Sequence, residues 1–336
     1  MRGAPFLACG LVALACASPS PEPSATASDG RQAMGTVLEL TIVGPDAEAL
    51  VGALARLFAE VERLEALLSD WDPTSEVGRL NASAGLGRRS VAPEVAELLG
   101  RSRALTRLTR GSFDVTVGPL VSLWREAGLR AELPTRAALA SALRRVGGEG
   151  IFVGADGSVA LPEGASVTLG GVAKGYALDR LLPLLGAAGV EAALLSFGES
   201  STWALGAPPG TSGWRLLARA PQGGFAGVLT LRDRALSVSG SFGSFSEIEG
   251  RRFGHVLDPR SGEPLEQESE ALVIAPDATI AEALSKALLV LGAREGIALV
   301  DGLPGCEALL LDARGRGRRT RGWDAAVAWE PLGPEA

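Results

Sequence analysis

The chain contains a single histidine, His255, in the segment GHVLDPRSGEP at 254–264. Imidazole is the side chain whose ordinary pKa best suits proton transfer near neutral pH. A solitary histidine between Gly and Val is usually structural, so this motif alone leaves a catalytic role open. Counting excludes a metal site made of several histidines and any Cys/His cluster.

Paired glycines followed by a lysine form a second motif, GGVAKGYALD at 170–179. Gly170 and Gly171 precede Lys174 and a helical stretch, so backbone amides and an ammonium face one place, as at helix N-termini that hold phosphate. The spacing fits neither a Walker loop nor the dinucleotide-binding fingerprint. A plain strand-to-helix turn with a solvated Lys174 is the alternative.

Two more segments carry charged residues at chemically useful positions. GSFDVTVGPL at 111–120 places Asp114 directly after an aromatic residue and ends in Gly-Pro. The predicted helix ATIAEALSKALLVLG at 278–292 sets Glu282 and Lys286 four residues apart. Taken alone, that pair is an ordinary ion pair on a helix surface.

Helices and strands must position these residues, and they follow one another irregularly along the chain. This order favours an α+β or complex α/β fold over a doubly wound sheet. Apolar residues at spacings of three and four predict helices over 46–69, 92–109, 176–188 and 279–301. Short apolar or β-branched runs predict strands at 37–44, 151–153, 158–161, 192–197, 214–219, 226–232, 236–239, 253–257, 271–275 and 307–312.

Length and composition bound the class of protein. The 336 residues suffice for one large or two fused units, and the 46% hydrophobic and 21% charged residues exclude extensive disorder. The formal charge of -7 has the wrong sign for nucleic-acid binding through the overall field. Cys306 is predicted to be a buried small hydrophobic residue. The basic stretch at 314–322 is predicted to be a solvated hairpin tip, with contact to an anionic surface as the alternative.

The N-terminal end has the form of an export signal. Residues 1–16 place an arginine before a short apolar run, and the small residues before Cys16 resemble the lipobox of bacterial lipoproteins. This predicts an exported protein that faces the periplasm and is anchored to the membrane through lipid on Cys16; ordinary cleavage near Ala17 is the alternative. Residues 17–30 are rich in Ser, Pro and Ala and predict a flexible tether, so the folded domain is expected over 31–336.

Together and in this order, the motifs resemble the ApbE-like FAD:protein FMN transferases from about residue 33 to about residue 312. The segments that carry the resemblance are AMGTVLEL (33–40), LLSDWDPTSEVGRLN (67–81), GSFDVTVGPL, LGGVAKGYALD, SVSGSF (237–242), GHVLDPRSGEP and AEALSKALLVLG. The resemblance implies a bacterial exported enzyme that binds FAD and a divalent metal ion, normally Mg²⁺. Such an enzyme transfers the FMN half of FAD to a threonine of an acceptor protein and releases AMP.

The resemblance also implies roles for individual residues. His255 lies in the motif credited with activating the acceptor hydroxyl, and Lys174 lies beside the flavin nucleotide as a second catalytic candidate. The implied FAD contacts are Met34, Trp71 (in place of a common Tyr), Ser112, Phe113, Asp114, Thr168 (in place of a common Asp), Lys174 and Val256. The implied metal positions are the backbone of Gly171 and the side chains of Thr279, Glu282 and Lys286.

Lys286 departs from the family pattern at the metal site. A lysine cannot be an oxygen ligand, and an ammonium that points into the site, as we expect here, repels a cation or occupies its place. The alternative is a Lys286 that turns outward to solvent, which leaves Glu282 and carbonyl oxygens to hold Mg²⁺. Glu282 replaces a common Asp and retains a carboxylate of the kind that Mg²⁺ binds. Three alternatives to a working transferase therefore stay open: an FAD-binding pseudoenzyme with a degraded metal site, an FAD pyrophosphatase in which water replaces the acceptor hydroxyl, and a generic lipoprotein without a flavin site.

Overall fold

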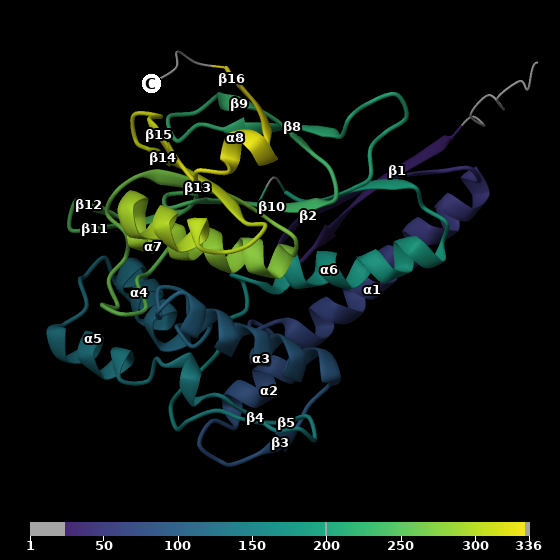
Figure 1. Ribbon diagram of the computed structural model, residues 1–336. Coiled ribbons are helices and arrows are strands. Elements are labelled where there is room, and N and C mark those ends of the chain that lie inside the picture. The colour runs from purple at the N-terminus through teal and green to yellow at the C-terminus, as the bar shows by residue number, and fades with distance from the viewer. Residues whose placement is uncertain (1–23, 199, 333–336) are drawn as a thin grey trace, which may run out of the picture.

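The computed structural model describes residues 24–198 and 200–332 (Figure 1). Its centre is an eight-stranded sheet with the spatial order β1-β2-β6-β7-β10-β13-β14-β15, in which every neighbouring pair is antiparallel. The strands are β1 (Ala25–Ala33), β2 (Thr36–Gly44), β6 (Ala192–Phe197), β7 (Ser201–Leu205), β10 (Arg234–Gly240), β13 (Ser269–Ala275), β14 (Glu307–Asp312) and β15 (Gly317–Arg319).

The central strands of this sheet are buried on both faces, whereas β1 and β15 at its two edges are mostly exposed. In β13, Ala271 and Val273 pack into one hydrophobic cluster, whereas Leu272 and Ile274 pack into the other. Successive side chains of a strand point to opposite faces, so covering both faces requires an apolar residue at nearly every position. The continuous apolar runs seen in the sequence follow from this two-sided burial.

Three helices cover one face of the sheet: α1 (Ala47–Leu68), α6 (Ala173–Ala187) and α7 (Ala278–Asp301) (Figure 1). In α1, the apolar stripe predicted from the sequence is buried, from Leu50 to Leu68. Asp46 caps the helix by accepting hydrogen bonds from two backbone amides of its first turn. Burial of such a stripe is what holds a surface helix on its sheet.

The other face is covered by a smaller sheet and a short helix (Figure 1). The smaller sheet pairs β8 (Trp214–Arg219), β9 (Phe225–Leu231) and β16 (Ala328–Pro331), and α8 (Trp323–Ala326) lies beside it. Trp323 is fully buried in the cluster between the two sheets.

A second, mainly helical region is inserted between β2 and β6 and lies beyond the helical layer (Figure 1). It contains α2 (Glu76–Ala82), α3 (Pro93–Leu108), α4 (Gly118–Arg130), α5 (Arg136–Leu143), a single 3-10 turn (Gly148–Gly150) and a small sheet of β3 (Arg89–Ser90), β4 (Phe152–Val153) and β5 (Ser158–Ala160). The hairpin of β11 (Phe245–Ile248) and β12 (Arg251–Gly254) packs on α4, with the rings of Phe253 and Trp124 5.3 Å apart.

The predicted α+β class is confirmed, with local corrections. Residues 25–30, expected in the tether, form the first part of β1, because they pair along their whole length with β2. The strand expected at 253–257 ends at Gly254, so His255 lies just after it. Of the stretch at 314–322, residues 314–319 are exposed around the turn into β15, as predicted for a solvated tip, whereas Thr320 is buried and Gly322 half-buried. Cys306 is buried, also as predicted.

The expected export signal and Cys16 lie outside the described residues. Among the helices that the structure describes, none has both the length and the apolar character needed to cross a membrane.

Candidate functional site

A cleft of about 740 Å³ lies where β10, α4, the start of α6, α7 and the segment after β12 meet. Cavities of this size hold ligands as large as dinucleotides. Ten of the residues singled out from the sequence line it: Ser112, Phe113, Asp114, Thr168, Gly170, Gly171, Lys174, His255, Val256 and Lys286. The fold therefore gathers into one place residues that are up to 174 positions apart in the chain, Ser112 and Lys286.

Lys174 reaches the cleft from the first turn of α6, which begins at Ala173, three residues earlier than predicted. A Cβ atom on Gly175 would lie 2.4 Å from the carbonyl oxygen of Ala278, so a glycine is needed for the starts of α6 and α7 to lie this close. The half-buried ammonium and the helix N-terminus together form a place suited to phosphate.

Asp114 lines the cleft but its carboxylate is already occupied. One oxygen accepts hydrogen bonds from the backbone amide and the hydroxyl of Thr116, at 2.8 and 2.6 Å, and the other accepts from the amide of Gly148 at 2.7 Å. Only 6% of the residue is exposed. Asp114 therefore stabilises the loop that carries Ser112 and Phe113, and its oxygens are directed at protein donors and not at a ligand.

His255 stands at the mouth of the cleft. Its Nδ1 lies 3.1 Å from the carbonyl oxygen of Ser244, which also accepts the backbone amide of His255. The backbone nitrogen of Ser244 also lies 3.3 Å from Nδ1, so the role of each ring nitrogen depends on the tautomer. In the tautomer that donates Nδ1–H to the Ser244 carbonyl, Nε2 of the neutral ring carries the free lone pair. Partial burial, followed by the positive charges of Lys286 and Lys174, lowers the pKa of His255. The imidazole is therefore neutral near pH 7 and can accept a proton.

Glu282 and Lys286 do not form the surface ion pair that their spacing alone suggests. Glu282 is fully buried, and its Oε1 accepts a hydrogen bond from the hydroxyl of Ser201. Its Oε2 has no hydrogen-bond partner among the described residues. Lys286 instead lines the cleft, as expected for an inward-pointing lysine, and no described residue pairs with it within 4 Å. Burial, partly offset by Glu282, lowers the pKa of Lys286.

The side chains at the expected metal positions do not fit a divalent cation. Thr279 is fully buried, and its hydroxyl donates to Asp179 Oδ2 at 2.6 Å instead of facing the cleft. Glu282 does not line the cleft either, and the residue that does, Lys286, brings a positive charge. Within the described ranges, no three His, Cys, Asp or Glu side chains group as metal ligands. The metal roles expected for Thr279 and Glu282 are thus not supported by their placement.

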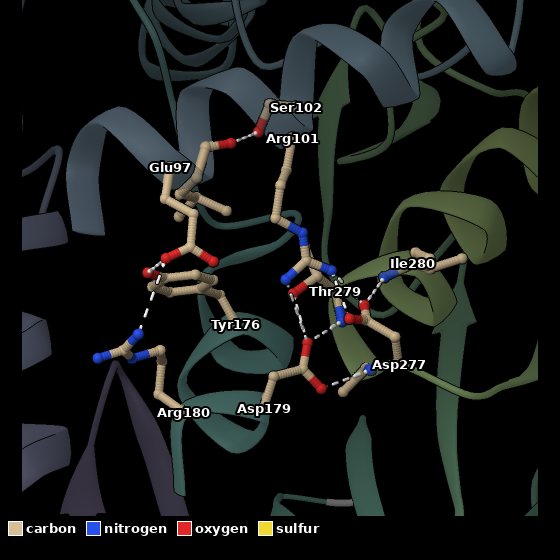
Figure 2. A network of polar contacts seen from close by, with 11 residues as sticks. Glu97, Arg101, Ser102, Tyr176, Asp179, Arg180, Asp277, Thr279 and Ile280 are labelled. Carbon is tan, nitrogen blue, oxygen red and sulfur yellow. Dashed lines mark hydrogen bonds and ion pairs between the residues drawn. The ribbon is translucent and has the colours of Figure 1, made fainter. Parts of the chain in front are cut away.

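Behind the cleft, a polar network joins α3, α6 and the start of α7 (Figure 2). Asp179 accepts hydrogen bonds from the backbone amides of Ala278 and Thr279, and Arg101 lies between Asp179 and Asp277. Nearby, the hydroxyl of Tyr176 donates to Glu97 at 3.0 Å. Asp179, the last residue of the GGVAKGYALD motif, therefore links α6, which carries Lys174, to α7, which carries Lys286.

Two expected FAD contacts lie outside the cleft lining. Met34 occupies the turn between β1 and β2 with a φ of 48°, directly before Gly35, which does line the cleft. Trp71 is 72% exposed, with the guanidinium of Arg125 5.3 Å from its ring. Arg125 lies one helical turn after Val121, a lining residue of α4, so Trp71 is placed near the rim.

Several lining residues were not singled out from the sequence. They include Val121 and Val290, two apolar side chains on helices, and Ser239, Gly243 and Ser244, which lie in or next to the SVSGSF segment. A sequence signal existed for α4, because Pro119 precedes Leu120, Trp124 and Ala127, which are all buried on one helical face.

A larger hollow of about 1150 Å³ lies elsewhere, between the kinked second half of α7 and the β14–β15 turn. Its basic residues, such as Arg314 and Arg316, are exposed, and Arg316 pairs with Asp312. None of the residues expected to do chemistry lines it. The smaller cleft is therefore the candidate active site.

Comparison with known proteins matches residues 34–310 to the ApbE family. "FAD:protein FMN transferase" of Treponema pallidum is 31% identical over 86% of this chain and 85% of its own length. The protein of the same name from Klebsiella pneumoniae is 29% identical over 81% and 80% of the two chains.

Solved structures agree with these relatives. The apo crystal structure of the Pseudomonas stutzeri flavinyl transferase ApbE covers 90% of this chain and 97% of its own, with a TM-score of 0.78 and 28% identity. The apbe protein of Thermotoga maritima covers 90% and 99%, with a TM-score of 0.81 and 25% identity.

Proposed function

The chain belongs to the ApbE family, and from this premise we propose that it is an FAD:protein FMN transferase. It moves the FMN moiety of FAD onto a threonine hydroxyl of an acceptor protein and releases AMP. The observation that carries the proposal is the convergence of Lys174, Lys286 and a neutral His255 on one cleft of dinucleotide size.

The reaction is a phosphoryl transfer, which needs charge neutralisation on the pyrophosphate and a base for the attacking hydroxyl. The threonine oxygen attacks the phosphorus atom of the FMN half, and a new phosphoester bond forms. The bond from that phosphorus to the bridging oxygen breaks, and AMP leaves with this oxygen. The hydroxyl proton passes to Nε2 of His255, in the tautomer whose Nδ1–H is donated to the Ser244 carbonyl.

The cleft suggests an order for the parts of FAD. The pyrophosphate lies at the N-terminus of α6, beside Lys174 and Gly171, where amides and an ammonium face the ligand. Ser112, Phe113 and the other lining residues of this region then contact the flavin nucleotide. Met34 and Trp71, at the rim, contact the parts of FAD that extend from the cleft.

An FAD-binding pseudoenzyme is the second candidate function. It is favoured by one specific observation, the absence of a donor set for Mg²⁺ at Thr279, Glu282 and Lys286. An FAD pyrophosphatase is the third, because water in place of the acceptor hydroxyl would meet the same base.

Intact-mass measurement separates the three functions. The protein is incubated with FAD and a flavinylation-acceptor domain, with His255→Ala as the control variant. An FMN-sized addition to the acceptor supports the transferase, and its loss in the His255→Ala variant assigns the base. Bound FAD that stays intact indicates a pseudoenzyme, and free FMN with AMP and an unmodified acceptor indicates a pyrophosphatase.

We further propose that the protein is exported and held at the membrane by lipid on Cys16, facing the periplasm. The support is the sequence before Cys16 alone, because these residues lie outside the described part of the chain. Cell fractionation tests it: the Cys16→Ser variant should leave the membrane fraction. A wild-type protein found wholly in the soluble periplasmic fraction would contradict the proposal.

A further inference from the structure

The charges that face the cleft are those of an anion site, not of a cation site. The described titratable residues in its lining are Asp114, Lys174, His255 and Lys286. The Asp114 carboxylate accepts three hydrogen bonds from Thr116 and Gly148 and only 6% of the residue is exposed, so its oxygens are directed at protein donors and not at a ligand. The described titratable groups that a ligand meets in the cleft are therefore the ammonium groups of Lys174 and Lys286 and the imidazole of His255. A divalent cation would be repelled by this set, whereas a pyrophosphate would be attracted.

The position of Lys286 in the cleft is fixed by its neighbours on α7. The Ser285 hydroxyl lies within hydrogen-bond distance of the Ser237 and Ser239 hydroxyls of β10, at 3.0 and 2.8 Å. Leu284 and Leu288, on either side, are fully buried. Rotating the helix would break these contacts, so the residue after Ser285 must face the cleft, as does Val290 one turn later.

Glu282 supplies a counter-charge from inside the protein. It lies one turn before Lys286 on α7, fully buried, and its negative charge opposes the lowering of the Lys286 pKa by burial. Its position under the cleft surface lets it favour the protonated lysine without entering the ligand site. A buried charge of this kind is costly unless an opposite charge is near, and Lys286 is that charge.

From this arrangement we infer that Lys286, together with Lys174, is a resident cation for the pyrophosphate, and that the cleft binds FAD without a divalent metal ion. The inference rests on the proposed FAD site. Lys286 donates charge-assisted hydrogen bonds to phosphate oxygens and neutralises part of their charge. Lys174 does the same from the N-terminus of α6, and the Glu282 carboxylate favours the charged form of Lys286 against the effect of burial.

Calorimetric titration of FAD and of riboflavin into the protein, each in EDTA and in Mg²⁺, tests the inference. Riboflavin has the same ring system but no phosphate, so it reports on folding and on the flavin contacts alone. FAD affinity should agree within about twofold between EDTA and Mg²⁺. Lys286→Met should weaken FAD binding by roughly 10- to 100-fold, as expected for loss of a charged hydrogen-bond donor. Riboflavin affinity should not change, and Lys286→Arg, which keeps the charge, should restore most of the FAD affinity.

Two results would overturn the inference: FAD binding that requires Mg²⁺, or unchanged FAD affinity in Lys286→Met. The acceptor assay keeps this outcome apart from that of the proposed function. Metal-independent FAD binding without FMN transfer contradicts the transferase and leaves the inference standing. FMN transfer together with FAD binding that requires Mg²⁺ supports the transferase and contradicts the inference.

Discussion

The hydroxyl oxygens of Ser239 and Ser285 lie 2.8 Å apart and join strand β10 to helix α7. Ser237, two residues before Ser239 and therefore on the same face of the strand, bonds to the same hydroxyl at 3.0 Å. All three hydroxyl groups are buried at the floor of the cleft region. This small polar cluster sets the rotation of α7, and so decides that Lys286 and not a neighbour faces the ligand.

Ser285→Ala is expected to lower the free energy of unfolding by about 1–3 kcal/mol, because it leaves two buried hydroxyls without their shared partner. Urea denaturation of wild type and variant measures the change. The triple variant with alanine at 237, 239 and 285 is the matched control. It leaves no orphaned hydroxyl and should recover part of the loss. A Ser285→Ala variant as stable as the wild type would show that the cluster does not hold α7.

The pKa of His255 should respond to the charge on Lys286. Partial burial and the nearby ammonium groups lower this pKa, so removing one of them in Lys286→Met should raise it toward the ordinary value. Since His255 is the only histidine, the imidazole signals in an NMR titration of untagged protein belong to it alone. Transfer needs the neutral ring, so the acid limb of the pH–rate profile should move to higher pH in the same variant.

Lys286→Arg is the control for this titration, because it keeps a positive charge at the same position and should leave the His255 pKa low. Lys174→Met provides a second comparison and should give a smaller shift, since Lys174 is the weaker of the two charges acting on the ring. An imidazole that titrates identically in all four proteins would contradict the electrostatic link between α7 and His255.

Asp179 should give the protein an unusual pH dependence of stability. Burial, and then the charge of Asp277, raise the pKa of Asp179 to about 6. The native state therefore holds a proton that the unfolded chain has lost, and the free energy of unfolding falls as pH rises from about 4 to about 6, by about 2 kcal/mol. Denaturation at several pH values compares wild type with Asp179→Asn, whose difference curve isolates this carboxyl. Parallel curves for the two proteins would refute the raised pKa.

The sequence predicted the elements whose apolar pattern is long and regular. The helix at 46–69 and the strands at 192–197 and 307–312 agree with α1, β6 and β14 to within about one residue. Elements were missed where their side chains carry no clear apolar pattern. β1, for example, consists of mostly exposed small and polar residues, and it is a strand because β2 offers it an edge to pair with.

At the candidate site, too, some features could be predicted from local sequence and others depend on tertiary contacts. Motifs such as 170–179 and 254–264 contain the residue types that the chemistry needs, so Lys174 and His255 could be predicted from them. The orientation of the Thr279 side chain could not be predicted, because its hydroxyl donates a hydrogen bond to Asp179, which lies 100 residues earlier in the chain. The hydrogen bond that Asp114 accepts from the Gly148 amide is likewise a tertiary contact that no local pattern encodes.

Trp71 offers a final prediction, at the rim of the cleft. Its ring is 72% exposed, unusually open for so large an apolar group, and Arg125 links it to the helix turn after Val121. An exposed indole beside a nucleotide cleft can stack on a base, here the adenine of FAD, and stacking stabilises the complex. Trp71→Ala should therefore weaken FAD binding by about 1–3 kcal/mol. FMN lacks the adenine, so its affinity should stay constant if the ring stacks there.

Fluorescence titration with FAD and with FMN measures both affinities in the variant. Leu86→Ala is the control, because Leu86 is similarly exposed, at 82%, and does not line the cleft. Trp71→Phe should retain most of the FAD affinity, since a smaller ring still stacks. Equal losses for FAD and FMN would place the indole against the isoalloxazine instead. No loss for either ligand would remove Trp71 from the binding site, and its exposure would then need another partner to explain it.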